Sequence, residues 1–274
     1  MIKVAAVQMG ASTSAGDNLR RMKDYVVEAC THTPDLDVIV FPEYCYYEPH
    51  TAQDALDHAL TVPGPLTDAL AELAVRYHVN IVSGSFAEKA PGGKMFNSVV
   101  FIDRSGRILA NYHKIHLMVG MNFDESEYVE FGDHVCVFDT DFGRVGMMVC
   151  YDLRFPELAR TMVLNGADVI FVSSCFPSGS PLPPRTDHWD ILTQSTALLN
   201  LTYTVASNQF GSTCCDNHFG RSCIVDPWGI ATAKAAGGEC IVYGELDLEY
   251  QRAIRENMRA ILNRRPELYD INRK

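Results

Sequence analysis

The chain has 274 residues, of which 47% are hydrophobic and 21% charged, a composition that excludes disordered, collagen-like and low-complexity proteins. Asp and Glu number 34 against 23 Lys and Arg, and the net charge of -11 makes nucleic acid and anionic membranes poor partners. The sequence shows neither a run of about 18 apolar residues nor the pattern of a secretory signal peptide. Because its nine cysteines are odd in number and form no CxxC pair, we expect a reduced, cytoplasmic protein.

Short apolar strands alternate with amphipathic helices in the first half, a rhythm typical of layered α/β proteins. Gly106 supplies the positive φ that a hairpin turn needs. The expected elements are a strand over 3–9, a helix over 17–30, a strand over 37–41, a helix from about 65 to 77, a strand over 80–85, and a hairpin of strands 96–103 and 108–113.

The second half follows the same rhythm. Its strand at 168–172 (DVIFV) closely matches the strand at 37–41 (DVIVF), which suggests two similar halves. The expected elements are strands near 136–139 and over 144–150, a helix from 156 to 165, a strand over 168–173, a helix over 189–199, a strand over 203–208, a hairpin around 226–229, a strand over 240–246 and a helix over 248–262.

Three segments place a reactive side chain just after an apolar strand, where open α/β sheets usually build their sites. They contain Glu43, Lys114 and Cys150. A thiol between a strand end and a helix N-terminus gains from the helix dipole, and a nearby lysine lowers its pKa further. A carboxylate can take the thiol proton and later give it to a leaving amine. The pattern therefore predicts Cys150 as a nucleophile.

The two histidines beside Lys114 allow other hypotheses. His113 and His116 face opposite sides of an extended chain and lack a third ligand, so we expect no metal site. In a Cys-His amidotransferase subunit, either histidine would activate Cys150. A catalytically inactive binding or scaffolding protein is a further hypothesis, but it has no need of a base, a cation and a thiol together.

The three motifs resemble, in order, those of the nitrilase, or carbon-nitrogen hydrolase, superfamily. They are FPE at 41–43, HKIHL at 113–117 and CYDLRFPE at 150–157, and the resemblance extends from VAAVQ at 4–8 to RRPELY at 264–269. It implies an α/β fold, a four-layer αββα sandwich of two pseudo-symmetric halves, in one domain over 1–274. It also implies a thiol hydrolase without a cofactor.

The resemblance also assigns roles to single residues. It implies that Glu43 is the general base, Lys114 the cation that stabilises the tetrahedral intermediate, and Cys150 the nucleophile. The backbone N–H of Tyr151 would be the second oxyanion donor. Many members carry a second glutamate between the lysine and the cysteine, and Glu125 matches it.

Glu127 and Glu130 are close rivals for this second carboxylate. Four further residues are candidates for substrate binding: Arg154, Cys175, Phe176 and Arg185. Each has a second interpretation, because the arginines could form ordinary ion pairs, Arg154 with Glu157 for example, and Cys175 and Phe176 could be packing residues. We expect the vicinal Cys214 and Cys215 to be reduced thiols in a loop.

The residues after the nucleophile distinguish branches of the superfamily. True nitrilases commonly have Trp-Glu there, whereas this chain has Tyr151 and Asp152. The difference favours an amidase acting on a small aliphatic or ω-amide; an N-carbamoyl amide hydrolase is the alternative, and a nitrilase is less favoured. The resemblance further implies a homodimer or larger even homo-oligomer, with a C-terminal tail over 263–274 that contacts a partner subunit.

Overall fold

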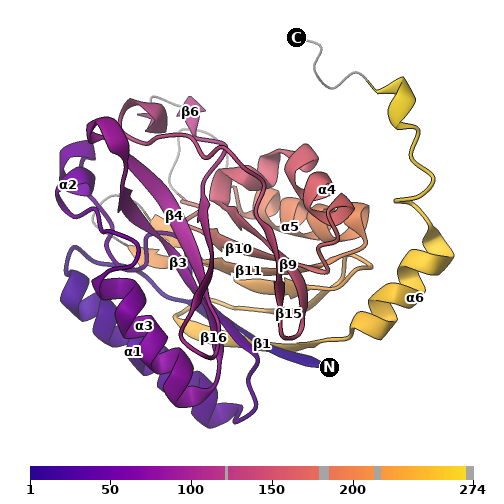
Figure 1. Ribbon diagram of the computed structural model, residues 1–274, viewed down its shortest axis with the longest axis horizontal. Coiled ribbons are helices and arrows are strands. Elements are labelled where there is room, and N and C mark those ends of the chain that lie inside the picture. The colour runs from indigo at the N-terminus through magenta and orange to yellow at the C-terminus, as the bar shows by residue number, and fades with distance from the viewer. Residues whose placement is uncertain (121–122, 179–184, 213–216, 270–274) are drawn as a thin grey trace.

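Two six-stranded sheets lie face to face at the centre of the molecule, and helices cover their outer faces (Figure 1). The computed structural model describes residues 1–120, 123–178, 185–212 and 217–269. The first sheet has the order β16 (Cys240–Leu246), β1 (Ile2–Gln8), β2 (Val38–Val40), β3 (Asn80–Lys89), β4 (Met95–Ile102) and β5 (Ile108–His113). The second has the order β15 (Ala231–Lys234), β14 (Cys223–Val225), β11 (Tyr203–Asn208), β10 (Val169–Ser174), β9 (Gly143–Val149) and β8 (Val137–Thr140).

The two sheets have the same topology, strand for strand. β1, β2 and β3 pair in parallel and correspond to β9, β10 and β11. In each sheet, the strands on both sides of this parallel group are antiparallel to it. The edge strand β16 comes from the end of the chain and pairs with β1, in the same way that β8 pairs with β9. The similar sequences 37–41 and 168–172 fall on β2 and β10, so the predicted pseudo-symmetric halves are present.

Alternation along the strands explains the four layers. In β1, Val4 and Ala6 point into the core between the sheets, while Ala5 and Val7 point toward the helices. The outer face of the first sheet is covered by α1 (Ala15–His32) and α3 (Pro65–Tyr77), and that of the second by α4 (Pro156–Leu164) and α5 (Thr186–Asn200). The predicted αββα sandwich is therefore confirmed.

Hydrogen bonds join the two sheets where their parallel strands end. The hydroxyl of Ser173 donates to the carbonyl of Phe41 at 2.9 Å, and that of Ser207 donates to the carbonyl of Val7. The backbone N–H of Glu43 donates to the carbonyl of Ser174 at 3.2 Å. The bonds of Phe41 and Glu43 hold the loop after β2 against the end of β10, and the bond of Ser207 joins β11 to β1.

Several element ends differ from the expected ones for local reasons. Helix α1 begins earlier because Ser14 caps it by accepting a hydrogen bond from the backbone N–H of Asp17. Helix α6 (Leu248–Met258) ends earlier than 262 because Arg259 adopts a left-handed conformation, φ 53°. Short elements outside the predictions are α2 (Ala52–Asp57), β6 (Val119–Gly120), β7 (Phe123–Asp124), β12 (Phe210–Ser212), β13 (Asn217–Phe219), and the 3-10 turns η1 (Pro91–Gly93), η2 (Glu125–Glu127), η3 (Cys150–Arg154) and η4 (Pro266–Leu268).

After α6 the chain extends away from the body of the molecule (Figure 1). Leu262, Leu268 and Tyr269 of this segment are more than half exposed. Within the described ranges, no helix combines the length and the apolar character that a membrane span requires.

Candidate active site

A buried ammonium group lies between two buried carboxylates. Lys114 follows β5, and its Nζ is 3.3 Å from Oε1 of Glu43 and 3.0 and 2.9 Å from the two carboxylate oxygens of Glu125. All three residues are at most 3% exposed. Isolated buried charges are very costly, so each of these charges depends on the others.

The pKa values of Glu43 and Lys114 both shift in the direction that favours the charged form. Burial alone would raise the pKa of Glu43, but the Lys114 ammonium and hydrogen bonds from Cys175, Cys150 and Asn97 outweigh it and lower that pKa. Burial would likewise lower the pKa of Lys114, but the two carboxylates raise it well above its ordinary value. Glu43 is thus held as a carboxylate beside a buried cation.

Asn97 is a member of the cluster that the sequence analysis missed. It lies in β4, is fully buried, and its amide donates to Glu43 at 2.9 Å and to Glu125 at 3.3 Å. The backbone N–H of Met118 also donates to Glu125, at 2.9 Å. These donors orient both carboxylates toward Lys114.

Only Glu125 of the three candidate glutamates contacts the lysine in the described part of the chain. Glu127 is exposed, and the carboxylate of Glu130 lies 4.0 Å from Lys94. Glu125, the first residue of η2, is buried, whereas Glu127, the last residue of the same turn, is exposed.

Cys150 is placed by a strained turn at the end of β9. It is the first residue of η3 and has φ 45°, a left-handed conformation that is uncommon for cysteine and typical of functional sites. The thiols of Cys150 and Cys175 and a carboxylate oxygen of Glu43 all lie within 4.8 Å of one another. The base, the cation and the thiol predicted from three distant motifs are therefore neighbours.

Asp152 holds this turn in place, a role that the sequence did not reveal. Its buried carboxylate accepts hydrogen bonds from the backbone N–H of Val149 at 2.9 Å, the hydroxyl of Tyr112 at 2.7 Å and the backbone N–H of His116 at 3.0 Å. Because these donors come from both sides of the site, Asp152 fixes the Cys150 turn relative to the Lys114 loop.

Both histidines are engaged by partners other than Cys150. His113 Nε2 lies 3.0 Å from Glu88 and its ring stacks on Phe96. His116 Nδ1 lies 2.8 Å from Asp152, and its ring stacks on Phe155. This arrangement offers no support for the Cys-His hypothesis.

The four predicted substrate-binding residues lie together on the second half of the chain. Cys175 donates to Glu43 Oε2 through its backbone N–H at 3.0 Å and through its thiol at 2.9 Å. The neighbouring Phe176 ring, 2% exposed, has the guanidinium carbons of Arg154 and Arg185 at 5.6 and 5.8 Å from its centre. Cys214 and Cys215 lie outside the described residues.

An αββα sandwich with a glutamate, a lysine and a cysteine gathered where its two sheets end is the architecture of nitrilase-type enzymes. Residues 3–256 match the family model described as carbon-nitrogen hydrolase, and the chain belongs to this family. The resemblance predicted from the motifs is confirmed.

Relatives match the chain over nearly its whole length. It is 31% identical to omega-amidase NIT2 of Homo sapiens over 99% of this chain and 98% of that protein, and 31% identical to omega-amidase NIT3 of Saccharomyces cerevisiae over 99% and 96%. The crystal structure of Saccharomyces cerevisiae Nit3, a member of branch 10 of the nitrilase superfamily, is similar with a TM-score of 0.85, 29% identity and coverage of 100% and 97%. A carbon-nitrogen hydrolase from Helicobacter pylori has a TM-score of 0.89 with 25% identity and coverage of 98% and 96%.

The position of Lys114 predicts that it controls the reactivity of Cys150. Lys114→Met removes the cation that favours the thiolate, so we expect iodoacetamide to alkylate Cys150 about tenfold more slowly at neutral pH. Peptide mass spectrometry measures the rate at each cysteine, and circular dichroism checks the fold. Lys94→Met, a surface substitution, is the matched control. Equal alkylation rates in both variants would contradict this role.

Proposed function

We propose that this protein is an amidase that hydrolyses the terminal amide of a small carboxylic acid, an ω-amide, through a thioester on Cys150. The observation that carries the proposal is the pair of guanidinium groups, Arg154 and Arg185, on the ring that follows Cys175. They supply a site for the carboxylate at one end of a substrate whose amide is at Cys150.

In the first step Glu43 accepts the proton of the Cys150 thiol, and the thiolate attacks the amide carbonyl. A carbon–sulfur bond forms and the carbonyl oxygen becomes an oxyanion. The Lys114 ammonium and the backbone N–H of Tyr151 stabilise that charge. Glu43 then gives its proton to the nitrogen, ammonia leaves, and the thioester remains.

The second step releases the acid. Glu43 takes a proton from a water molecule, the hydroxide attacks the thioester, and the same oxyanion donors act again. The thiolate leaves and recovers its proton from Glu43. Glu125 contacts Lys114, and Asn97 contacts both Glu43 and Glu125. Both act as positioning residues, because they hold Lys114 and Glu43 in place through both steps.

Electrostatics supports a carboxylate-bearing substrate. Two guanidinium groups contact the Phe176 ring, and a carboxylate bound to either of them would accept charged, bidentate hydrogen bonds. Among the described residues, Nε of Arg185 is buried without a hydrogen-bond partner. The omega-amidase names of the relatives agree with this substrate class.

We expect arginine substitution to affect only substrates that carry the carboxylate. Arg154→Met should raise KM for the monoamide of a dicarboxylic acid about tenfold or more, since a charged hydrogen bond contributes about 1.5–3 kcal/mol. KM for the methyl ester of the same monoamide, which is neutral, should change little. Arg76→Met, which removes an arginine from the face of Tyr77, is the matched control.

The assay that tests the function measures ammonia and carbon dioxide released from ω-amides, carbamoyl amino acids and nitriles. We expect ammonia without carbon dioxide from the ω-amides, and no release by Cys150→Ala. If the enzyme preferred the carbamoyl compounds and released carbon dioxide from them, it would be the alternative carbamoylase. If the unsubstituted enzyme had the same KM for the monoamide and for its methyl ester, the proposed role of the arginines would be wrong.

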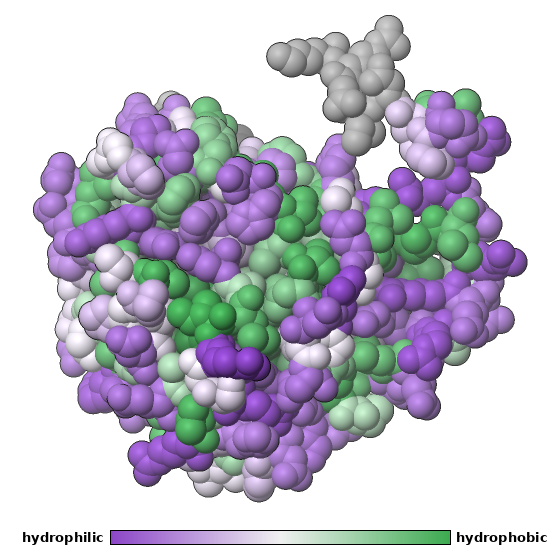
Figure 2. Space-filling model, viewed as in Figure 1, coloured by the Kyte–Doolittle hydropathy of each residue, from purple (hydrophilic) through white to green (hydrophobic). Residues whose placement is uncertain are grey.

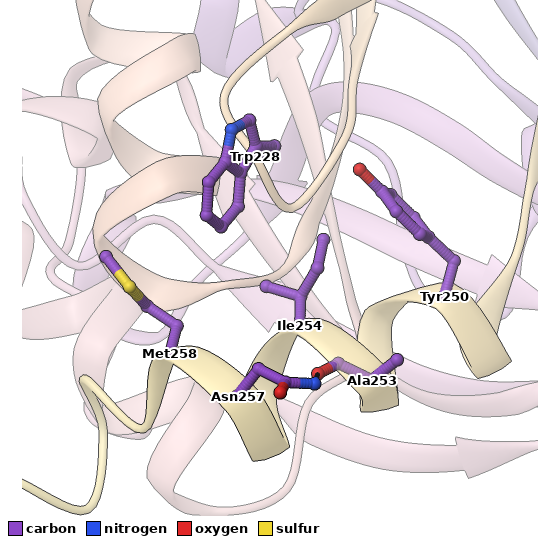
Figure 3. A pocket seen from close by; sticks show the side chains of 6 residues that line it. All are labelled: Trp228, Tyr250, Ala253, Ile254, Asn257 and Met258. Atoms are coloured by element: carbon purple, nitrogen blue, oxygen red, sulfur yellow. Dashed lines mark hydrogen bonds between the residues drawn. The ribbon is translucent and has the colours of Figure 1, made fainter.

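We further propose that the single domain over 1–274 forms a homodimer or larger even assembly through the side of the molecule beside α6. The loop between β14 and β15 brings Trp228 toward α6, where a hollow opens between them (Figure 3). Figure 2 also shows hydrophobic residues on the side of the molecule where α6 lies in Figure 1. The exposed apolar residues on these elements and on α5 are Ile191, Leu198, Leu199, Trp228, Ile230, Tyr250 and Met258.

A second copy of the chain fits this surface, because exposed apolar patches of this kind usually mark protein interfaces. The extended segment after α6, with its own exposed Leu262, Leu268 and Tyr269, would lie across the partner as the tail prediction requires. The free thiols of the described cysteines agree with a reducing compartment, so we place the enzyme in the cytoplasm.

Light scattering after size exclusion tests the assembly. We expect twice the mass of one chain or an even multiple, and a shift toward the monomer in Trp228→Glu, because a buried unpaired carboxylate opposes association. Val75→Glu changes an exposed apolar residue on α3 and is the control. A fully active monomer at every protein concentration would contradict the proposal.

A further inference from the structure

The second thiol at the active site forms and breaks no bond to the substrate in the hydrolysis proposed above. Cys175 follows β10, and Cys150 follows the neighbouring parallel strand β9, with Val149 opposite Ser173 in the register. The two sulfur atoms lie within 4.8 Å of each other, and both residues are partly exposed. Extending this register places Cys150 level with Ser174, so Cys150 and Cys175 are diagonal neighbours on strands about 4.7–4.9 Å apart. That placement is compatible with the Cα separations of disulfides, roughly 4.4–6.8 Å.

We propose that Cys150 and Cys175 form a reversible disulfide when the enzyme meets a peroxide, and that this bond protects the nucleophile from irreversible oxidation. The inference rests on the proposed function only in taking Cys150 as the reactive thiol. Cys175 would be the resolving cysteine that such a reaction requires.

The chemistry proceeds in two balanced steps. The Cys150 thiolate attacks one oxygen of the peroxide, a sulfur–oxygen bond forms, the oxygen–oxygen bond breaks, and the hydroxide that leaves takes up a proton to become water. The sulfur of Cys175 then attacks the sulfenic acid, and the sulfur–sulfur bond forms as hydroxide departs. Two thiols are oxidised and one hydrogen peroxide is reduced to two water molecules.

The position of Glu43 favours the second step. Its Oε2 already accepts a hydrogen bond from the Cys175 thiol at 2.9 Å, so it can take the proton of Cys175 and pass it to the departing hydroxide. Lys114, 3.3 Å from the same carboxylate, favours the thiolate that begins the reaction. Rotation of the two side chains then has to bring the sulfurs to bonding distance.

The same three groups could in principle hold a thiophilic metal ion, since two thiols and a carboxylate are suitable ligands. The Lys114 ammonium opposes metal binding. It already pairs with the Glu43 carboxylate, so a divalent cation bound there would lie close to a second positive charge. A disulfide carries no charge and avoids that repulsion. The geometry therefore favours oxidation over metal binding.

Peroxide treatment followed by thiol blocking and peptide mass spectrometry tests the proposal. We expect a linked peptide that contains Cys150 and Cys175, a loss of activity in proportion to the linked fraction, and recovery of both with dithiothreitol. In Cys175→Ser, Cys150 should instead gain two oxygen atoms and become a sulfinic acid, and dithiothreitol should not restore that variant's initial activity. Cys240→Ser, a half-buried thiol on β16, should behave as the unsubstituted enzyme.

Two results would overturn the inference. One is sulfinic acid on Cys150 in the unsubstituted enzyme without a linked peptide. The other is a disulfide from Cys150 to Cys214 or Cys215 in place of Cys175. The linked peptide is measured without any assay of amide hydrolysis, so a protein that forms the bond but hydrolyses no amide would overturn the proposed function and leave this inference supported.

Discussion

The Lys114 ammonium, buried between two carboxylates, is the interaction on which the site depends. Its partners come from distant parts of the chain, Glu43 from the loop after β2 and Glu125 from η2. Removing the lysine would leave two buried carboxylates without their cation, which costs several kcal/mol. The three loops must therefore adopt their positions together, and the charges that stabilise this arrangement are also those that the chemistry needs.

The two sheets provide the frame for this cluster. The first half supplies Glu43 and Lys114, and the second half supplies Cys150 and Cys175, so neither half holds all four residues of the cluster. Hydrogen bonds from Ser173 and Ser207 to the backbone of the first sheet align the strand ends of the two halves. Gln209 adds a further bond, from its amide to the carbonyl of Glu43 at 2.8 Å. Fold and site thus share the same contacts.

Much of the fold could be predicted because its signals are local. Apolar runs marked the strands, caps and glycines marked the turns, and the repeated sequence at β2 and β10 indicated the two halves. The missed helix α2 also has a local signal, because Thr51 caps it by accepting a hydrogen bond from the backbone N–H of Asp54. Its brevity and its few buried residues hid it.

The supporting residues of the site could not be predicted, because their partners are distant in sequence. Asn97 contacts Glu43 across 54 positions, and Asp152 contacts Tyr112 across 40. The available signal was a polar residue within an apolar strand, since buried polar groups require partners. Such a signal shows that a partner exists but does not identify it.

The central claim is that Glu43 is the base that serves Cys150, and intact-mass spectrometry of Glu43→Gln tests it most directly. An activated ester with a good leaving group needs little proton transfer for acylation, so the variant should form the Cys150 thioester and accumulate it for want of a base to activate water. Glu127→Gln, on the exposed side of η2, should turn over the ester without accumulation. Turnover by Glu43→Gln at the unsubstituted rate, with no trapped adduct, would contradict the claim.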